Sequence, residues 1–153
     1  MKNIIAIIFI SLVSSSCYKE NIYTNYYSFK DQIWYSDSSI VFNFNSNEST
    51  NINLNLGISY TNDYPYQNFY TSYSLLDSSK NIIKSEMLEF QLFEKKYGYP
   101  IGSGIFKNFF LDSLIANIDP INKNSEYILL VKHSMRDKEL IGISRLAVDV
   151  TSK

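Results

Sequence analysis

The chain has 153 residues, with 14 basic and 15 acidic side chains, one cysteine and one histidine. This near-neutral balance argues against a nucleic-acid or anionic-lipid surface, because both ligands attract clustered lysine and arginine. A lone cysteine excludes an intramolecular disulfide, and a lone histidine excludes a metal site or catalytic group built from several histidines. We therefore expect no metal, no cofactor and no nucleic-acid partner.

The N-terminal segment has the features of a bacterial lipoprotein signal peptide. Lys2 precedes an apolar run at residues 4–13. Ten helical residues reach roughly 15 Å, about half the thickness of a bilayer core, so this run is too short to span a membrane. Serines and then Cys17 follow, as in a lipobox, although Ser14 stands where an aliphatic residue is usual. We predict cleavage before Cys17 and lipidation of its thiol.

Acyl chains on Cys17 would anchor the protein, because each buried methylene contributes about 0.8 kcal/mol of membrane affinity and two or three chains hold firmly. The alternative is a secreted protein with a stray thiol, which is a liability in an oxidising compartment. Tyr18 stands where an aspartate would favour the inner membrane, so we expect the outer membrane of the cell envelope. We predict a signal peptide at residues 1–16, a lipidated tether at residues 17–32 and a folded domain at residues 33–153.

Beyond the tether, the hydrophobic pattern is that of β-strands. Trp34 opens the folded part, as a plug at one end of the core. The clearest strand is NINLNLGISY, in which apolar residues alternate with asparagine, glycine and serine, so that the two sets lie on opposite faces. In chain order, strands are expected at residues 39–45, 51–60, 69–76, 82–92, 105–115, 127–135 and 141–150, with a short helix as the alternative at 105–115. Residues 117–126, around Pro120, are expected to form a polar loop.

About seven or eight short strands, with turns at roughly ten-residue spacing and no convincing long helix, predict an all-β protein. The strands at 69–76 and 82–92 are separated by turn-forming residues and are expected to belong to a meander. Two packed sheets would bury alternate residues from each strand. We predict a single antiparallel β-sandwich, jelly-roll-like, with a small barrel as the alternative.

The titratable residues do not form a recognisable catalytic pattern. His133 falls on the buried face of a predicted strand, where a histidine with satisfied hydrogen bonds is expected. A glycosidase needs two carboxyl groups facing one groove, whereas Glu86 and Glu89 point to opposite faces of a strand. Asp137 and Glu139 lie in a turn beside basic residues, where a solvated charge cluster is the default. We expect no catalytic residues and no enzymatic activity.

Two tyrosine-rich loops are the candidate binding surface. They are TNDYPYQN at residues 61–68 and YGYPIGSG at residues 97–104. Tyrosine rings stack on sugars and also anchor protein interfaces. The glycines of the second loop do not form a phosphate loop, because no Lys-Ser/Thr pair and no helix follows them. The candidates for an exposed platform are Tyr64, Tyr66, Tyr70, Tyr97 and Tyr99, and the alternative is that several of them cap the ends of the sandwich.

Three stretches resemble the gliding-motility lipoprotein GldH family of Bacteroidetes. They are the two tyrosine-rich loops and SMRDKELIGISRLAVDV at residues 134–150, which carries the Met-Arg and Leu-x-Gly-Ile of that family. The resemblance runs from about Trp34 to Val150 and fits the lipoprotein signal ahead of it. It implies an outer-membrane lipoprotein without enzymatic activity that supports gliding over surfaces, in a system linked to type IX secretion.

With this resemblance, we expect a non-enzymatic protein that acts through partners in the gliding and secretion apparatus. Arg136 is expected to pin the first loop to the last strand. The alternative is a polysaccharide-binding module that uses exposed tyrosine loops. The expected partner-binding residues are Asp63, Tyr64, Pro65, Tyr66, Asn68 and Arg136.

Overall fold

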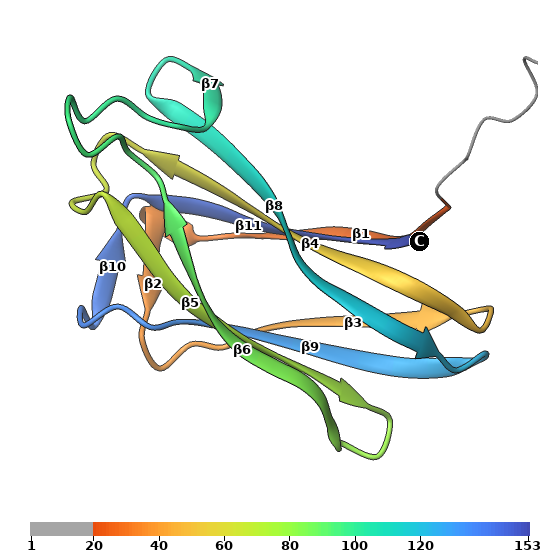
Figure 1. The fold of residues 1–153 in the computed structure, drawn as a ribbon. Helices are drawn as coiled ribbons and strands as arrows, with labels where there is room; N and C mark the ends of the chain where they lie inside the picture. The colour runs from red at the N-terminus through yellow and green to blue at the C-terminus, as the bar shows by residue number, and fades with distance from the viewer. Residues whose placement is uncertain (1–19) are drawn as a thin grey trace, which may run out of the picture.

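The structure is a computed structural model that describes residues 20–153; the predicted signal peptide and Cys17 lie outside them. The described chain is built almost wholly of strands, with one short 3₁₀ helix, η1 (Figure 1). In chain order the elements are β1 (Asn21–Ser28), η1 (Lys30–Gln32), β2 (Ile33–Tyr35), β3 (Ile40–Ser46), β4 (Thr50–Thr61), β5 (Asn68–Asp77), β6 (Ile82–Gln91), β7 (Ser103–Ile105), β8 (Asn108–Ile121), β9 (Ser125–His133), β10 (Glu139–Ile141) and β11 (Ile143–Ser152).

The strands form two packed sheets and a small third one. The five-stranded sheet has the order β1-β11-β4-β8-β7, the four-stranded sheet β3-β9-β5-β6, and the two-stranded sheet pairs β10 with β2. All paired strands are antiparallel, and the long connections cross from one large sheet to the other. This order is that of a jelly roll, so the predicted sandwich is confirmed. The predicted meander is limited to the β5–β6 hairpin.

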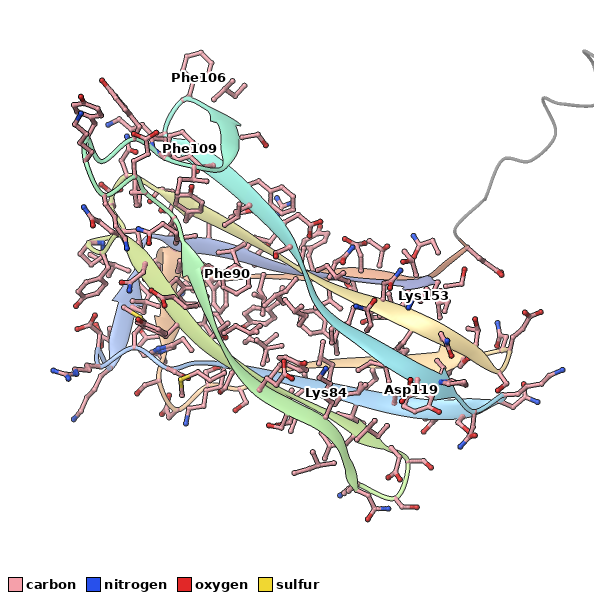
Figure 2. All side chains as sticks on the ribbon, in the orientation of Figure 1. Lys84, Phe90, Phe106, Phe109, Asp119 and Lys153 are labelled. Carbon is pink, nitrogen blue, oxygen red and sulfur yellow. The ribbon has the colours of Figure 1, made fainter. Side chains whose placement is uncertain are left out.

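Strand β4 shows why this sequence builds a two-layer core. Its apolar residues are fully buried on one face, while Asn55 and Ser59 on the other face are partly exposed. Each buried aliphatic side chain stabilises the fold by about 1.5–3 kcal/mol relative to an exposed one. The four-stranded sheet supplies the facing layer, and side chains fill the space between the sheets (Figure 2). The buried set on β4 is Ile52, Leu54, Leu56, Ile58 and Tyr60.

Part of the segment predicted as a tether is an edge strand of the five-stranded sheet. β1 pairs with β11, and the Thr24 hydroxyl donates a 2.6 Å hydrogen bond to Oδ1 of Asp149. Tyr23 packs its ring 5.7 Å from that of Phe44 on β3. The folded domain therefore begins near Asn21 rather than at residue 33. The sequence did not reveal this strand because most of its side chains are exposed and do not alternate.

Two further segments are more regular than expected. β8 continues through the predicted polar loop to Ile121, and both Ile118 and Ile121 are buried. Pro120 is tolerated because β8 pairs on one side only at this point, so that a missing N–H need not break a sheet ladder. β7 begins within the second tyrosine-rich stretch, residues 97–104, which the sequence predicted as a loop.

The two-stranded sheet closes one end of the sandwich. Trp34 of β2 lies opposite Leu140 of β10 and is fully buried, which confirms the predicted plug. Its ring stacks on Phe29 at 4.7 Å and meets His133 edge-on at 5.4 Å. His133 is buried, but neither ring nitrogen has a hydrogen-bond partner. The prediction of a satisfied histidine is therefore wrong.

The two ends of the sandwich differ. The start of β1 and the C-terminus lie side by side at one end of the sandwich, which we call the anchor end (Figure 1). β2 and β10 lie at the opposite end, which we call the loop end. The Ser152 N–H donates a 2.9 Å hydrogen bond to the Glu20 carbonyl at the anchor end. Within residues 20–153, no helix is long and apolar enough to cross a membrane.

Candidate functional site

The first tyrosine loop, residues 62–67 between β4 and β5, lies at the loop end beside the connection from β9 to β10. The start of β5 holds that connection through two backbone contacts. The Ser134 N–H donates to the Tyr70 carbonyl at 2.8 Å, and the Tyr70 N–H donates to the sulfur of Met135 at 3.3 Å. The fold thus brings the loop at residues 61–68 together with the Met-Arg motif at residues 135–136.

A hydrogen bond between side chains joins the two segments. The Tyr66 hydroxyl donates to Oδ2 of Asp137 at 2.6 Å. This bond raises the pKa of the Tyr66 phenol, because the carboxylate accepts a proton that ionisation would remove. Asp137, which the sequence analysis placed in a solvated charge cluster, therefore pins the first loop. Arg136 does not: its side chain is exposed, and the one ion pair found within residues 20–153 joins Lys84 to Glu86.

A shallow pocket of about 210 Å³ lies where these segments meet. Two phenol rings, a thioether and a guanidinium surround it. Aromatic, methionine and arginine side chains are enriched at protein interfaces, because they combine contact area with directional bonding. The pocket can therefore accept a side chain of a partner protein, with the guanidinium free to pair with a carboxylate. The lining residues are Tyr66, Tyr70, Ser134, Met135 and Arg136.

Tyr64 is a core residue rather than a binding residue. Its side chain is 4% exposed, and its hydroxyl donates to the Asn68 carbonyl at 2.8 Å. Burial raises the pKa of the Tyr64 phenol well above its ordinary value. Gly142, at a φ of +82°, packs against the Tyr64 backbone so closely that a Cβ there would overlap it. This role of Gly142 was not predicted, and its signal in the sequence is a lone glycine in the stretch LIGIS.

The other predicted residues of this loop have different surroundings. The Asn68 amide donates to Glu89 at 2.9 Å and to the Tyr70 hydroxyl at 3.2 Å, and the bonds from Asn68 and Tyr70 lower the pKa of Glu89. Asp63 and Pro65 are exposed and do not line the pocket. Of the six predicted binding residues, the structure therefore places Tyr66 and Arg136 in one pocket.

The second tyrosine loop lies next to the first. The N–H groups of Leu92 and Phe93 both donate to the Gln67 carbonyl, at 2.8 and 3.0 Å. Tyr97 and Tyr99 are exposed, with ring centroids 6.0 Å apart. A platform of all five tyrosines does not form, because one of the five lies in the core. Tyr66 and the half-buried Tyr70 remain beside the pocket, and the exposed pair Tyr97 and Tyr99 remains on the second loop.

The jelly roll and the loops that meet at one end define a β-sandwich protein with a pocket formed by its loops. Its sequence identifies it more closely. A family model described as GldH lipoprotein matches residues 21–150, and the chain belongs to this family. It is therefore a gliding-related lipoprotein, anchored to the cell envelope. The stretches that resemble the family include the three segments that meet at the loop end.

Solved structures with a similar chain path are distant. A VP2 subviral particle of infectious bursal disease virus aligns with 86% of this chain and 33% of its own length, at a TM-score of 0.42 and 11% identity. A family 35 carbohydrate-binding module from Clostridium thermocellum aligns with 88% of this chain and 98% of its own, at a TM-score of 0.40 and 15% identity. PorU from Porphyromonas gingivalis aligns with 89% of this chain and 13% of its own, at a TM-score of 0.34 and 14% identity. These scores carry no functional argument. A comparison with curated proteins finds no match.

Among residues 20–153, no group of three histidine, cysteine, aspartate or glutamate side chains is arranged to hold a metal ion.

Proposed function

We propose that this lipoprotein supports gliding as a non-enzymatic interaction protein of the outer membrane, in machinery linked to type IX secretion. In this proposal, acyl chains on Cys17 fasten the anchor end to the membrane. The pocket between Tyr66 and Arg136 binds a partner protein of the apparatus. The observation that carries the proposal is the position of this pocket, at the end of the sandwich opposite the start of β1.

The length of β1 gives the scale of this separation. Eight strand residues at about 3.3 Å each extend roughly 26 Å. If the tether joins the domain at Asn21, the pocket at the loop end lies roughly this distance from the point where the tether enters. A lipid-anchored domain of this shape can present its loops to a partner while its anchor stays in the bilayer.

A capture experiment tests the partner-binding surface. The tagged lipoprotein is crosslinked in living cells and purified from detergent extracts, as the original protein and as Arg136→Ala. Because Arg136 is exposed and pairs with no carboxylate, the substitution should leave the melting temperature unchanged and reduce the captured partner. Arg145→Ala is the matched control, since Arg145 is also exposed but lies over the Tyr26 ring on the five-stranded sheet. Equal capture by all three proteins, with equal melting, refutes the proposed surface.

The anchor and the process are tested separately. Cys17→Ala should release the protein from the outer-membrane fraction of a density gradient and abolish gliding in a strain that lacks the original gene. Mass spectrometry of the original mature protein should find acyl chains on the thiol. A bare thiol, or normal gliding of the Cys17→Ala strain, overturns the lipid-anchored role. Capture of components of the secretion apparatus would support the type IX link.

A second candidate function is polysaccharide binding. The observation that favours it is the exposed pair Tyr97 and Tyr99, whose rings are available for stacking. Glycan-array binding that disappears in Tyr97→Ala and Tyr99→Ala, but persists in Arg136→Ala, would support this function. Silence across a broad array would refute it.

A further inference from the structure

The two long sides of the sandwich are closed differently. On one side, the edge strands β1 and β3 are bridged by the contact between Tyr23 and Phe44. On the other side, β6 is the edge strand of one sheet, β8 is flanked only by the short strand β7 in the other, and β6 and β8 do not pair with each other (Figure 1). The sandwich is therefore laterally open between β6 and β8 in the part of the chain that the structure describes.

Most of the outer edge of β8 has no strand beside it. β7 covers only Asn108–Phe110, and from Leu111 onward β8 pairs with β4 alone. The turn between β7 and β8 consists of Phe106 and Lys107, both at positive φ, as in a two-residue hairpin. Backbone groups alternate in direction along a strand, so those of Asp112 point to the same side as those of Asn108 and Phe110. The chain's own β7 thus demonstrates that this edge accepts a strand.

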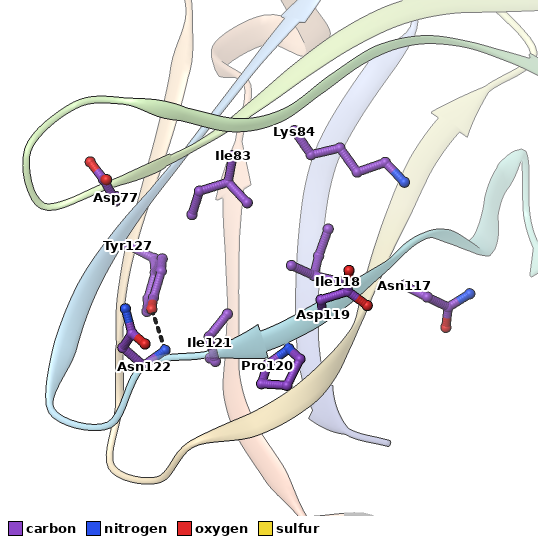
Figure 3. Close-up of a pocket in the computed structure, with 10 residues that line it drawn as sticks. All are labelled: Asp77, Ile83, Lys84, Asn117, Ile118, Asp119, Pro120, Ile121, Asn122 and Tyr127. Atoms are coloured by element: carbon purple, nitrogen blue, oxygen red, sulfur yellow. Dashed lines mark hydrogen bonds between the residues drawn. The ribbon is translucent and has the colours of Figure 1, made fainter.

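The side chains that line the opening are partly apolar. Leu88 of β6 and Leu111 and Ile115 of β8 are only half-buried, although they pack against the core. Toward the anchor end the opening widens into a pocket of about 400 Å³, where β6 faces the end of β8 (Figure 3). A strand laid along β8 would cover these apolar groups with every second side chain.

The solvent-facing side of the same edge is acidic. Asp112 lies on the outer face of the five-stranded sheet near Asp149, and burial followed by this like charge raises the pKa of Asp112. The single ion pair within residues 20–153 is Lys84–Glu86, so neither aspartate is paired with a cation there. Basic side chains on the outer face of an added strand would relieve this repulsion.

Other features of the two edges oppose pairing with a second copy of the chain. β8 carries a register shift near Leu114 and a proline at position 120, and β6 directs Lys84 and Glu86 toward the interior side of its sheet. Bulges, prolines and inward charges are the devices by which edge strands avoid pairing with one another. A separate segment, matched to this edge in charge and pattern, is the occupant that these features favour.

We propose that the outer edge of β8, at residues 111–119, is a strand-addition site for an extended polypeptide segment of alternating apolar and basic residues. The added strand would continue β7, place its apolar residues over Leu111 and Ile115, and place its basic residues beside Asp112. Main-chain hydrogen bonds would supply affinity, and the alternation would supply specificity. The site is separate from the pocket at Arg136 and does not depend on the proposed function.

The test uses the full mature lipoprotein in detergent and a fluorescent nine-residue peptide of alternating valine and lysine. Fluorescence anisotropy should show saturable binding, and Asp112→Lys should weaken it at least tenfold. Glu126→Lys, which changes the net charge equally on an exposed position of the other sheet, should change it less than twofold. Arg136→Ala should bind the peptide as the original protein does.

Two further measurements separate strand pairing from simple charge attraction. A peptide with its central backbone amides methylated should not bind, because it cannot form a ladder. Hydrogen exchange of the Asp112 amide should slow on addition of the unmodified peptide. The proposal is overturned if the methylated peptide binds equally well, or if the unmodified peptide does not bind at millimolar concentration. It is also overturned if the protein self-associates without peptide and its Asp112 amide then already exchanges slowly.

Discussion

Replacing His133 with leucine should stabilise the protein, although it removes the only histidine. The His133 side chain is 2% exposed, and neither ring nitrogen has a hydrogen-bond partner. A buried polar group left unsatisfied costs about 1–3 kcal/mol. Leucine is close to histidine in size and has no polar atom. The substitution would also remove the edge-on contact with Trp34, which lowers this gain in stability by about 0.5–1.5 kcal/mol. The expected net gain is about 1 kcal/mol.

The gain should grow as the pH falls. Burial, followed by the nearby Lys132, lowers the pKa of His133 in the folded protein. The unfolded chain therefore binds a proton first, below about pH 6.5. The histidine protein loses up to about 1.4 kcal/mol per pH unit from that point until the pKa of folded His133 is reached. His133→Leu does not have this loss, so the difference in stability between the two proteins should widen from pH 7.5 to 5.5.

Urea unfolding measures both effects, with Trp34 fluorescence as a local probe, because Trp34 is the only tryptophan and contacts His133. A gain of about 1 kcal/mol corresponds to a rise in melting temperature of roughly 3–5 °C for a domain of this size. His133→Gln is the control, since it keeps a polar group in the site and should give no gain. A leucine variant that is less stable at pH 7.5, or a difference that does not change between pH 7.5 and 5.5, would refute the reasoning.

Two smaller predictions concern the loop end. Gly142→Ala should destabilise the protein by more than about 2 kcal/mol in urea unfolding, because it combines a positive φ with overlap onto the Tyr64 backbone. Gly98→Ala is the control: Gly98 has a similar φ but lies in open space, so this substitution should cost about 1 kcal/mol. Equal losses would contradict the packing role of Gly142. Tyr66→Phe should leave the melting temperature nearly unchanged but speed amide exchange at residues 134–138, because it removes the bond to Asp137; unchanged exchange would show that this bond does not order the connection.

The sequence predicted the strands better than it predicted their partners. The alternation in β4 depends only on which face is buried, so its period of two could be read directly from the chain. Which sheet each strand joins depends on contacts between strands far apart in sequence, such as β4 with β11 and β3 with β9. The predicted meander is limited to the β5–β6 hairpin for this reason, because β4 and β5 are neighbours in the chain but lie in different sheets. β1 was missed because an edge strand with few buried residues carries little hydrophobic pattern.

The same crossing of the chain explains which site residues were found. Tyr66 and Arg136 were predicted from two motifs without knowledge that the motifs touch, and they share a pocket only because β5 pairs with β9. That pairing places the start of β5 and the end of β9 together at the loop end, where Asp137 accepts a hydrogen bond from the Tyr66 hydroxyl. An aspartate flanked by basic residues in a turn carries no local sign of such a role. The loop surface is therefore a product of the jelly-roll topology, and the roles of Asp137 and Gly142 could be recognised only once that topology was known.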